Sequence, residues 1–304
     1  MQNAELRNYL HLHFIVFIFG FTAILGELIT LEAFSLVWYR MAIATVCIGI
    51  YAKLRSISLR ISKKNTVYLS LAGIVIALHW VTFFAAIKAS TISLTLAVLS
   101  SGAFFTSLLE PIVYKRKIVA YEVLLGLLVI AGLYIIFSVE QTYLEGMILA
   151  VISALLSSIF SLINGKFAHT YRPTVVSFYE IGAGTLFLSL YLLATSVSTS
   201  FELDSDFFSI SKSDLFYIGI LASVCTAYAF IGSVQVMKYL SPYTVMLTIN
   251  LEPVYGIALA YFIFGDKEQM TTTFYFGALL ILATVIANGI IKYYRKKNRN
   301  TASV

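Results

Sequence analysis

Charged side chains are scarce in this 304-residue chain, at 12% of the residues, whereas an ordinary soluble domain carries about 25%. Cysteine is almost absent as well, and the two present, Cys47 and Cys225, lie inside apolar runs. This excludes a disulfide framework and a zinc-type ligand pattern. Because 60% of the residues are apolar, the chain cannot cover a globule with polar surface. A soluble enzyme and a nucleic-acid-binding module are therefore excluded.

The chain consists mainly of long apolar runs. A helix that crosses a membrane needs about 20 mostly apolar residues. The sequence predicts ten such helices, at residues 12–30, 33–53, 67–87, 91–114, 119–138, 144–165, 174–196, 214–238, 241–264 and 271–293. The polar breaks between them are short, so we expect an all-α integral membrane protein without a folded domain outside the membrane.

The positions of the charges predict the orientation of these helices. If the N-terminus is cytoplasmic, 17 of the 21 Lys and Arg residues fall on the cytoplasmic side and 3 on the outer side, and Arg40 lies within a span. Ten of the 15 acidic residues fall outside. By the positive-inside rule, this asymmetry predicts that both termini are cytoplasmic, with a basic tail at residues 294–304. The net charge of +6 is thus a signal of orientation and not of nucleic-acid binding.

Ten spans divide into two halves of five, expected at residues 11–138 and 144–293. An odd number of spans in each half turns the second half upside down relative to the first, which is the arrangement of an inverted repeat. Weak self-similarity agrees, since an offset of 151 residues aligns Ser90 with Ser241 and Gly126 with Gly277. Such a repeat predicts a transporter with a site between the halves, near the middle of the membrane.

Four short segments carry a resemblance to a known family, by their order and spacing along the ten spans. They are WYRMA at residues 38–42, FAAIKAST at 84–91, LEPV at 251–254 and FGDKE at 264–268. Over residues 14–290 the chain resembles the EamA family of the drug/metabolite transporter superfamily, although residues 114–117 depart from the usual pattern of Gly-Glu before a basic residue. The resemblance implies an exporter or facilitator of the inner or plasma membrane that handles amino acids, other metabolites or drugs. It also implies a central cavity lined by helices of both halves.

Four charged residues are placed within the spans, where a charge near the centre costs about 2.5 to 3.5 kcal/mol and so needs a partner, a cavity or a neutral form. Glu110 lies near the cytoplasmic end, where charge pairing at the interface is expected, and the other three lie deeper. Arg40 and Glu180 occupy matching places in the second and seventh helices, and direct pairing between them is one option. Glu252 lies in the middle of the ninth span, and Pro253 beside it leaves a backbone carbonyl without its usual donor. We expect Glu252 to contact a substrate or to carry a proton. The alternative for all three is a structural role in helix packing.

Eight polar and aromatic residues are expected to line the cavity, and each has a structural alternative. A histidine can be hydrogen-bonded between helices, and a stripe of small residues can serve close helix packing. The expected lining residues are His79, Trp80, Phe83, Ser157, Ser161, Asn164, Gln235 and Asn250.

The function that these features predict is secondary transport of a small organic solute by alternating access, with proton coupling left open. The expected partners are this solute and the bilayer, and assembly as a homodimer is left open. No cofactor or metal is expected. The alternative is an intramembrane enzyme acting on a lipid-soluble substrate, although the chain has no His-Glu-x-x-His and no Gly-x-Ser-x-Gly motif.

Overall fold

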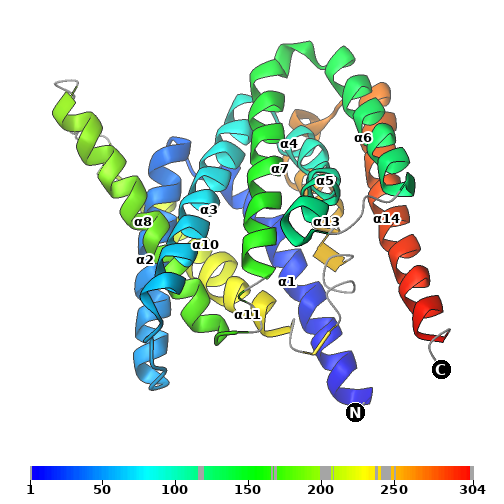
Figure 1. The fold of residues 1–304 in the computed structure, drawn as a ribbon. Coiled ribbons are helices and arrows are strands. Elements are labelled where there is room, and N and C mark those ends of the chain that lie inside the picture. Colours follow the sequence, from blue (N-terminus) through cyan, green and yellow to red (C-terminus); the bar gives the residue numbers. More distant parts are fainter. Residues whose placement is uncertain are drawn as a thin grey trace.

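The computed structural model describes residues 2–115, 120–165, 167, 170–198, 207, 209–236, 239–240, 248–249 and 251–301, and all regular elements in these ranges are helical. Nine helical segments of this part are long and apolar enough to cross a membrane. In chain order (Figure 1) the elements are α1 (Gln2–Leu28), α2 (Ala33–Leu54), α3 (Lys63–Ala89), α4 (Ile92–Leu99), α5 (Gly102–Tyr114), α6 (Ala120–Val139), η1 (Gln141–Tyr143), α7 (Leu144–Gly165), α8 (Pro173–Ser198), α10 (Lys212–Ala222), η2 (Ser223–Tyr228), α11 (Ala229–Val236), α13 (Glu252–Phe264), η3 (Gly265–Glu268) and α14 (Thr272–Thr301).

The described helices confirm an all-helical membrane fold and add detail at the helix ends. α1 begins at Gln2, well before the expected start at residue 12, since no proline or glycine interrupts its polar first turns. α14 likewise runs on to Thr301, through most of the expected basic tail. The ninth expected span is described from Glu252 onward as α13, and residues 241–247 and 250 lie outside the described ranges.

The fourth expected span consists of two helices, which corrects the prediction of one continuous helix over residues 91–114. α4 ends at Leu99 and α5 begins at Gly102, and the two residues between them form a turn. The hydroxyl of Ser100 donates to the carbonyl of Leu96 at 3.1 Å, in competition with the regular backbone ladder. Two serines followed by a glycine weaken the helix at this place.

Glycines allow the helices to approach closely at two crossings. A Cβ atom at Gly73 of α3 would lie 2.2 Å from the carbonyl oxygen of Glu180 in α8. At the crossing of α6 and α14, a Cβ at Gly132 would lie 3.0 Å from the carbonyl oxygen of Gly277, and a Cβ at Gly277 2.9 Å from that of Gly132. Small residues at such crossings permit the dispersion contacts on which helix association in a membrane depends.

The helices pack in a regular set of pairs. α3 packs on α7 and α8, and α1 packs on α10, α11 and α13. α2 contacts α8, α10 and η2, while α7 contacts α4 and α5. The remaining large contacts join α6 to α14 and α4 to α13. In Figure 1, α6 and α14 stand together at one side of the molecule and α2, α3 and α8 at the other.

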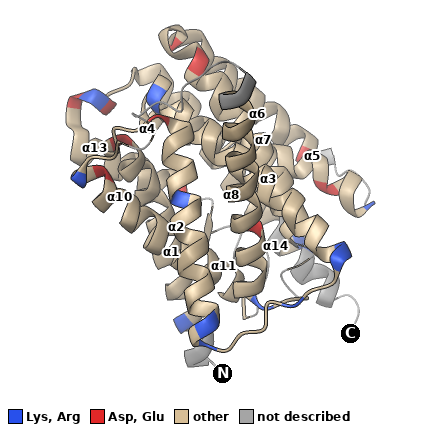
Figure 2. Ribbon diagram, turned by 90° about the vertical axis from the view of Figure 1, so that its left-hand side faces the viewer, with Lys and Arg blue, Asp and Glu red and all other residues tan. Residues whose placement is uncertain are grey.

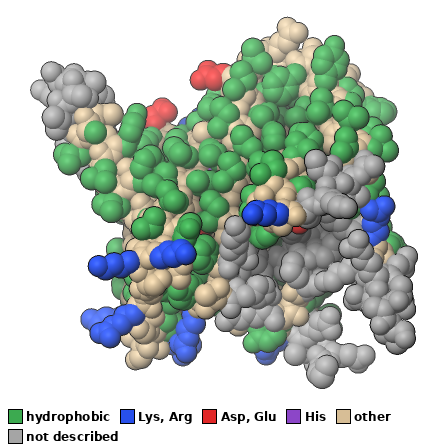
Figure 3. Space-filling model, in the orientation of Figure 1, with side chains coloured by type: hydrophobic (Ala, Val, Ile, Leu, Met, Phe, Trp, Pro, Cys, Tyr) green, Lys and Arg blue, Asp and Glu red, His purple; other side chains and the backbone are tan. Residues whose placement is uncertain are grey.

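The surface has an apolar belt and a basic end. Hydrophobic side chains cover most of the face in Figure 3, and Lys and Arg lie over its lower half. Both chain ends lie at this lower end in Figure 1, and Figure 2 shows Lys and Arg gathered there as well. Large apolar side chains such as Phe262 and Phe276 are 83% and 72% exposed. An exposed apolar belt of this extent requires a bilayer around it.

Candidate functional site

Arg40, in α2, is buried, with 2% of its surface exposed. Its Nε donates a hydrogen bond to Oγ1 of Thr226 at 2.7 Å, and its Cζ lies 3.8 Å from the centroid of the Trp80 ring. A second ring, Phe84, lies 5.5 Å away. A desolvated guanidinium over a tryptophan face is stabilised by about 2 kcal/mol or more. The Nη1 atom of Arg40 is buried and has no hydrogen-bond partner in the described part of the chain.

The partner of Arg40 lies in an irregular helical segment. Between α10 and α11 the chain forms a π-helix, η2, which contains Thr226 and the buried Cys225. The Thr226 hydroxyl donates to the carbonyl of Leu221 at 2.8 Å, so that it both closes the wide turn and accepts from the arginine. Such π segments occur frequently at functional sites. The sequence analysis did not identify this segment, because apolar content alone does not distinguish a π turn from an α turn.

Glu252 is the first residue of α13, with Pro253 in the first turn. This agrees with the expected break of the ninth span. Its carboxylate lies within electrostatic range of the Arg40 guanidinium. The two side chains therefore interact electrostatically. The hydrogen bond of the Arg40 guanidinium goes to Thr226. Of the three charged residues expected to matter within the spans, Arg40 and Glu252 interact through their charges.

Glu180 belongs to a separate polar pair. It is 0% exposed, and its Oε2 accepts from Nδ2 of Asn164 at 3.4 Å. The other carboxylate oxygen of Glu180 and Oδ1 of Asn164 are buried without a hydrogen-bond partner in the described residues. The pair joins α7 to α8. Glu180 therefore does not pair directly with Arg40.

His79 joins α3 to α7. Its Nδ1 lies 2.8 Å from Oγ and 3.0 Å from the carbonyl oxygen of Ser153, whose hydroxyl in turn lies 3.1 Å from the carbonyl oxygen of His79. The ring centroid of Phe83 lies 6.2 Å from that of His79. These contacts agree with the alternative of a histidine held between helices. A place for His79 and Phe83 in a cavity wall stays a prediction.

The other expected lining residues are distributed around these groups. Trp80 contacts Phe230 of α11 edge to face, with centroids 6.1 Å apart, in addition to its stack on Arg40. Ser157 and Gln235 are partly buried and Ser161 is exposed. Asn250 lies outside the described residues. The structure thus gathers Trp80, Arg40 and Glu252 into one group, which we call the Arg40 cluster together with Thr226.

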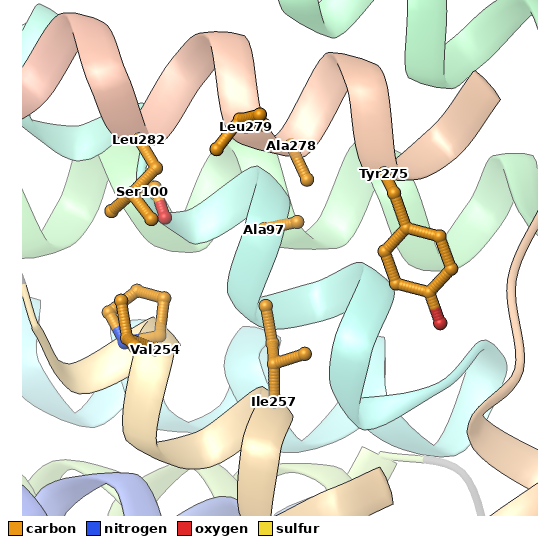
Figure 4. Close-up of a pocket in the computed structure, with 9 residues that line it drawn as sticks. Ala97, Ser100, Val254, Ile257, Tyr275, Ala278, Leu279 and Leu282 are labelled. Atoms are coloured by element: carbon orange, nitrogen blue, oxygen red, sulfur yellow. The ribbon is translucent and has the colours of Figure 1, made fainter. Parts of the chain in front are cut away.

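A pocket of about 290 Å³ lies between α4, α13 and α14 (Figure 4), and its lining includes Pro253, which follows Glu252 in the chain. It adjoins the two places where transmembrane helices are interrupted, the turn between α4 and α5 and the start of α13. Its walls are almost wholly apolar, and none of the expected lining residues belongs to them. The lining consists of Ala97, Ser100, Pro253, Val254, Ile257, Tyr275, Ala278, Leu279 and Leu282.

Three buried carboxylates hold connections together at the end of the molecule opposite the chain ends: two of them join the expected halves, and Glu140 joins the segment between the halves to the second half. Glu268 accepts hydrogen bonds from the backbone N–H groups of Ile92 and Ser93, at 3.1 and 2.8 Å, and so caps the start of α4. The sequence analysis had placed these acids only as outer charges. Asp214 accepts hydrogen bonds from N and Oγ1 of Thr30 at 2.8 and 2.7 Å, and Glu140 accepts one from Oγ1 of Thr271 at 2.9 Å. We call Glu268, Asp214 and Glu140 the carboxylate latches.

No three His, Cys, Asp or Glu side chains within the described ranges come together as metal ligands would. The chemistry available at the Arg40 cluster is therefore charge and hydrogen bonding. It comprises a fixed cation, a neighbouring carboxylate, a hydroxyl and aromatic faces.

Comparison with known proteins agrees with this fold. Residues 144–289 match the EamA-like transporter family. The uncharacterized transporter YxxF of Bacillus subtilis (strain 168) is 22% identical over 274 residues, which cover 88% of this chain and 84% of that protein. An uncharacterized transporter of Archaeoglobus fulgidus is 26% identical over 206 residues, or 67% of this chain and 70% of that one. A solved crystal structure shares the fold, with a TM-score of 0.62 at 15% identity over 92% of this chain and 96% of the other.

Proposed function

We propose that this chain is a secondary transporter of the EamA-like family, whose model its residues 144–289 match and to which its transporter-named relatives point. It carries a small organic solute across the inner or plasma membrane by alternating access, as its two halves rock about a site near the middle of the membrane. Both termini lie in the cytoplasm. The partners that follow from the family are a small-molecule substrate and the surrounding lipid.

The observation that carries this proposal is a matched pair of helix interruptions. The turn after α4 and the start of α13 are related by the same offset of 151 residues that aligns the two halves, since it pairs Ser100 with Leu251. α4 and α13 also pack against each other. Interrupted helices at corresponding places of two inverted halves are a recurring feature of transporter binding sites, because the free ends of half-helices supply polar groups at membrane depth.

The helix pairing supports an inverted repeat. If the halves are exchanged, the contact of α3 with α7 corresponds to that of the segment α10–α11 with α1. The contact of α2 with α10 and η2 corresponds in the same way to that of α8 with α3. The pairs α2–α8, α4–α13 and α6–α14 each correspond to themselves. A two-fold relation between the halves requires this set of contacts.

The carboxylate latches support a particular state of the cycle. Asp214 and Glu268 each bind a group of the opposite half, and Glu140, in the connection between the halves, binds Thr271 of the second half. All three lie in connections at the end away from the two chain ends. The positive-inside rule assigns that end to the outer side. We infer that the structure corresponds to the state in which the outer side is closed. Opening to the outside then requires the Asp214 and Glu268 latches to break.

Proton coupling through Glu252 is a separate part of the proposal. A carboxylate near the middle of a membrane, beside a buried cation, can take up and release a proton as its electrostatic surroundings change during the cycle. Substrate binding near Arg40 would alter those surroundings. Glu252 is the residue that we assign to this step.

The proposal is tested by reconstituting the purified protein in liposomes and measuring counterflow with a panel of amino acids, organic acids and organic cations. At least one class should exchange faster than in protein-free liposomes. Absence of exchange for every class, with protein shown to be folded and monodisperse, contradicts transport.

Alternating access is tested with a cysteine pair in place of Ser93 and Glu268, whose backbone and side chain lie in contact. A disulfide there should stop exchange, and a reductant should restore it. A matched pair within one half, in place of Asp266 and Gln269, should leave the rocking of the halves free. If the first pair cross-links fully and exchange continues at the original rate, the halves do not move apart at this end.

A further inference from the structure

The Arg40 guanidinium is an unbalanced group in the interior of the protein. It is buried at 2% exposure, Nη1 lacks a hydrogen-bond partner in the described residues, and its one hydrogen bond is to a neutral hydroxyl. A buried charge with unsatisfied donors is destabilising unless something else completes it. This destabilising group lies where the two halves meet, since Arg40 belongs to the first half and its partner Thr226 to the second.

The surroundings of Arg40 suit a ligand that has a hydrogen-bond acceptor at one end and an apolar group at the other. On one side the guanidinium plane is covered by the Trp80 ring at 3.8 Å, with Phe84 and Phe230 next to it. An aromatic ring against a guanidinium group fixes the orientation of the guanidinium plane. The N–H donors of the group then point outward within that plane. The Glu252 carboxylate acts on the guanidinium through its charge. Nη1 therefore lacks an acceptor, in the described residues, on a cation that has an aromatic ring over one side.

We propose that Arg40 binds the carboxylate group of the transported solute, and that the solute is an organic acid with an apolar body. This rests on the proposed function, because it takes the space between the halves as the path of the solute. A carboxylate matches the arginine fork with two parallel hydrogen bonds. The aromatic side chains around Trp80 then contact the apolar body. An organic cation would meet the like charge of Arg40 at this place and is disfavoured.

Thr226 is the positioning residue for this site. Its hydroxyl accepts from Nε at 2.7 Å and donates to the carbonyl of Leu221 within the π-helix. The arginine is thereby oriented by a segment of the second half, although it belongs to the first. Relative movement of the halves would break or re-form this hydrogen bond, and with it change the affinity of the fork for a carboxylate.

The chain contains two tryptophans, which makes a direct binding test available. Trp38→Phe leaves Trp80, which stacks on Arg40, as the single fluorescent reporter. The purified variant is titrated with three probes of the same shape: 3-phenylpropionate, its amide 3-phenylpropionamide, and the cation 3-phenylpropylamine. We expect a saturable change of Trp80 emission with the carboxylate. The amide and the amine should require concentrations higher by about tenfold or more, as expected for the loss of one charge-assisted hydrogen bond.

Two variants assign this preference to the arginine. Arg40→Met keeps a side chain of similar length without charge and should abolish the preference for the carboxylate over the amide. Arg40→Lys keeps the charge without the fork and should retain part of the preference. If Arg40→Met does not fold, the comparison of the three probes on protein with Arg40 intact still decides the question.

Equal responses to carboxylate and amide, a response to the amine alone, or no response to any probe would overturn the proposal. So would an unchanged carboxylate preference in folded Arg40→Met. The outcomes differ from those of the transport test. Carboxylate binding at Trp80 without counterflow of any solute contradicts transport alone, whereas counterflow restricted to cations contradicts the assignment of Arg40 alone.

Discussion

Glu268→Ala removes the carboxylate latch that joins η3 of the second half to the start of α4 in the first. In the structure this carboxylate accepts from the N–H groups of Ile92 and Ser93 at 3.1 and 2.8 Å and is buried. Alanine leaves the helix start without either acceptor. Because the two partners belong to different halves, the change weakens a contact that, in the proposed transport cycle, exists only while this end is closed.

The size of the effect follows from the two hydrogen bonds. A hydrogen bond to a charged group contributes about 1.5 to 3 kcal/mol, and we use the lower value because water can replace part of the loss at this end. The two together give about 3 kcal/mol, which corresponds to a factor of about 150 in the equilibrium between closed and open states. If the outer-open state is a minor state of about 1%, Glu268→Ala would make it the major one.

The native Cys225 provides the assay, because it is 1% exposed and lies beside Thr226 in the π-helix. In a Cys47→Ser background it is the single thiol. A membrane-impermeant maleimide applied from the outer side should label Cys225 slowly in the parent protein and tens of times faster in Glu268→Ala. The matched control is Asp266→Ala, since Asp266 is exposed in the same short helix and its carboxylate binds the side chain of Gln269 within that loop.

The reasoning fails if Glu268→Ala lowers the unfolding temperature but labels Cys225 at the parent rate. In that case the carboxylate stabilises the fold in every state and is not part of a gate. Equal acceleration in Asp266→Ala would refute it too, because a general loss of negative charge at this end would then explain the result.

Three further predictions concern the core. Glu252→Gln should abolish uptake driven by a pH gradient in liposomes while exchange continues, and an unchanged response to the gradient would remove Glu252 as the proton carrier. Gly73→Ala should lower the free energy of unfolding in detergent by about 1 to 3 kcal/mol, because the new Cβ would lie 2.2 Å from a carbonyl of α8; Gly219→Ala, where nothing lies within 4 Å, is the control and should have little effect. Thr226→Val leaves the Nε of the buried arginine without its acceptor and should cost about 1 to 3 kcal/mol in the same measurement. Thr284→Val, which loses only a hydrogen bond within its own helix, should cost less, and equal losses would contradict the role given to Thr226.

The helices themselves could be predicted from the sequence because hydropathy over about 20 residues is a local property. The break before α13 could be predicted as well, since Pro253 removes a donor whatever surrounds it. The break after α4 was missed, because Ser100 and Ser101 stand within an otherwise apolar run. The π-helix at residues 223–228 was missed for the same reason.

The candidate site was predicted only as a set of residues. Arg40, Glu180 and Glu252 were identified by the cost of a charge in lipid, which each residue has by itself. The partners were not predictable. Arg40 forms a hydrogen bond with Thr226, 186 positions away, and Glu180 forms one with Asn164. Arg40 and Glu180 therefore do not pair with each other.

The sequence by itself determined the class of the protein and the positions of most spans, because each depends on the transfer of a short segment into lipid. The charge asymmetry that predicts their orientation is also a property of the sequence alone. The tertiary structure decided which polar groups meet. In a membrane the lipid-facing and core-facing sides of a helix are both apolar, so hydrophobic periodicity does not tell which side faces inward. The contacts of Arg40 with Trp80 and of Glu268 with the start of α4 depend on how each helix is rotated and which helix lies beside it. Only the packing of all the helices together determines that.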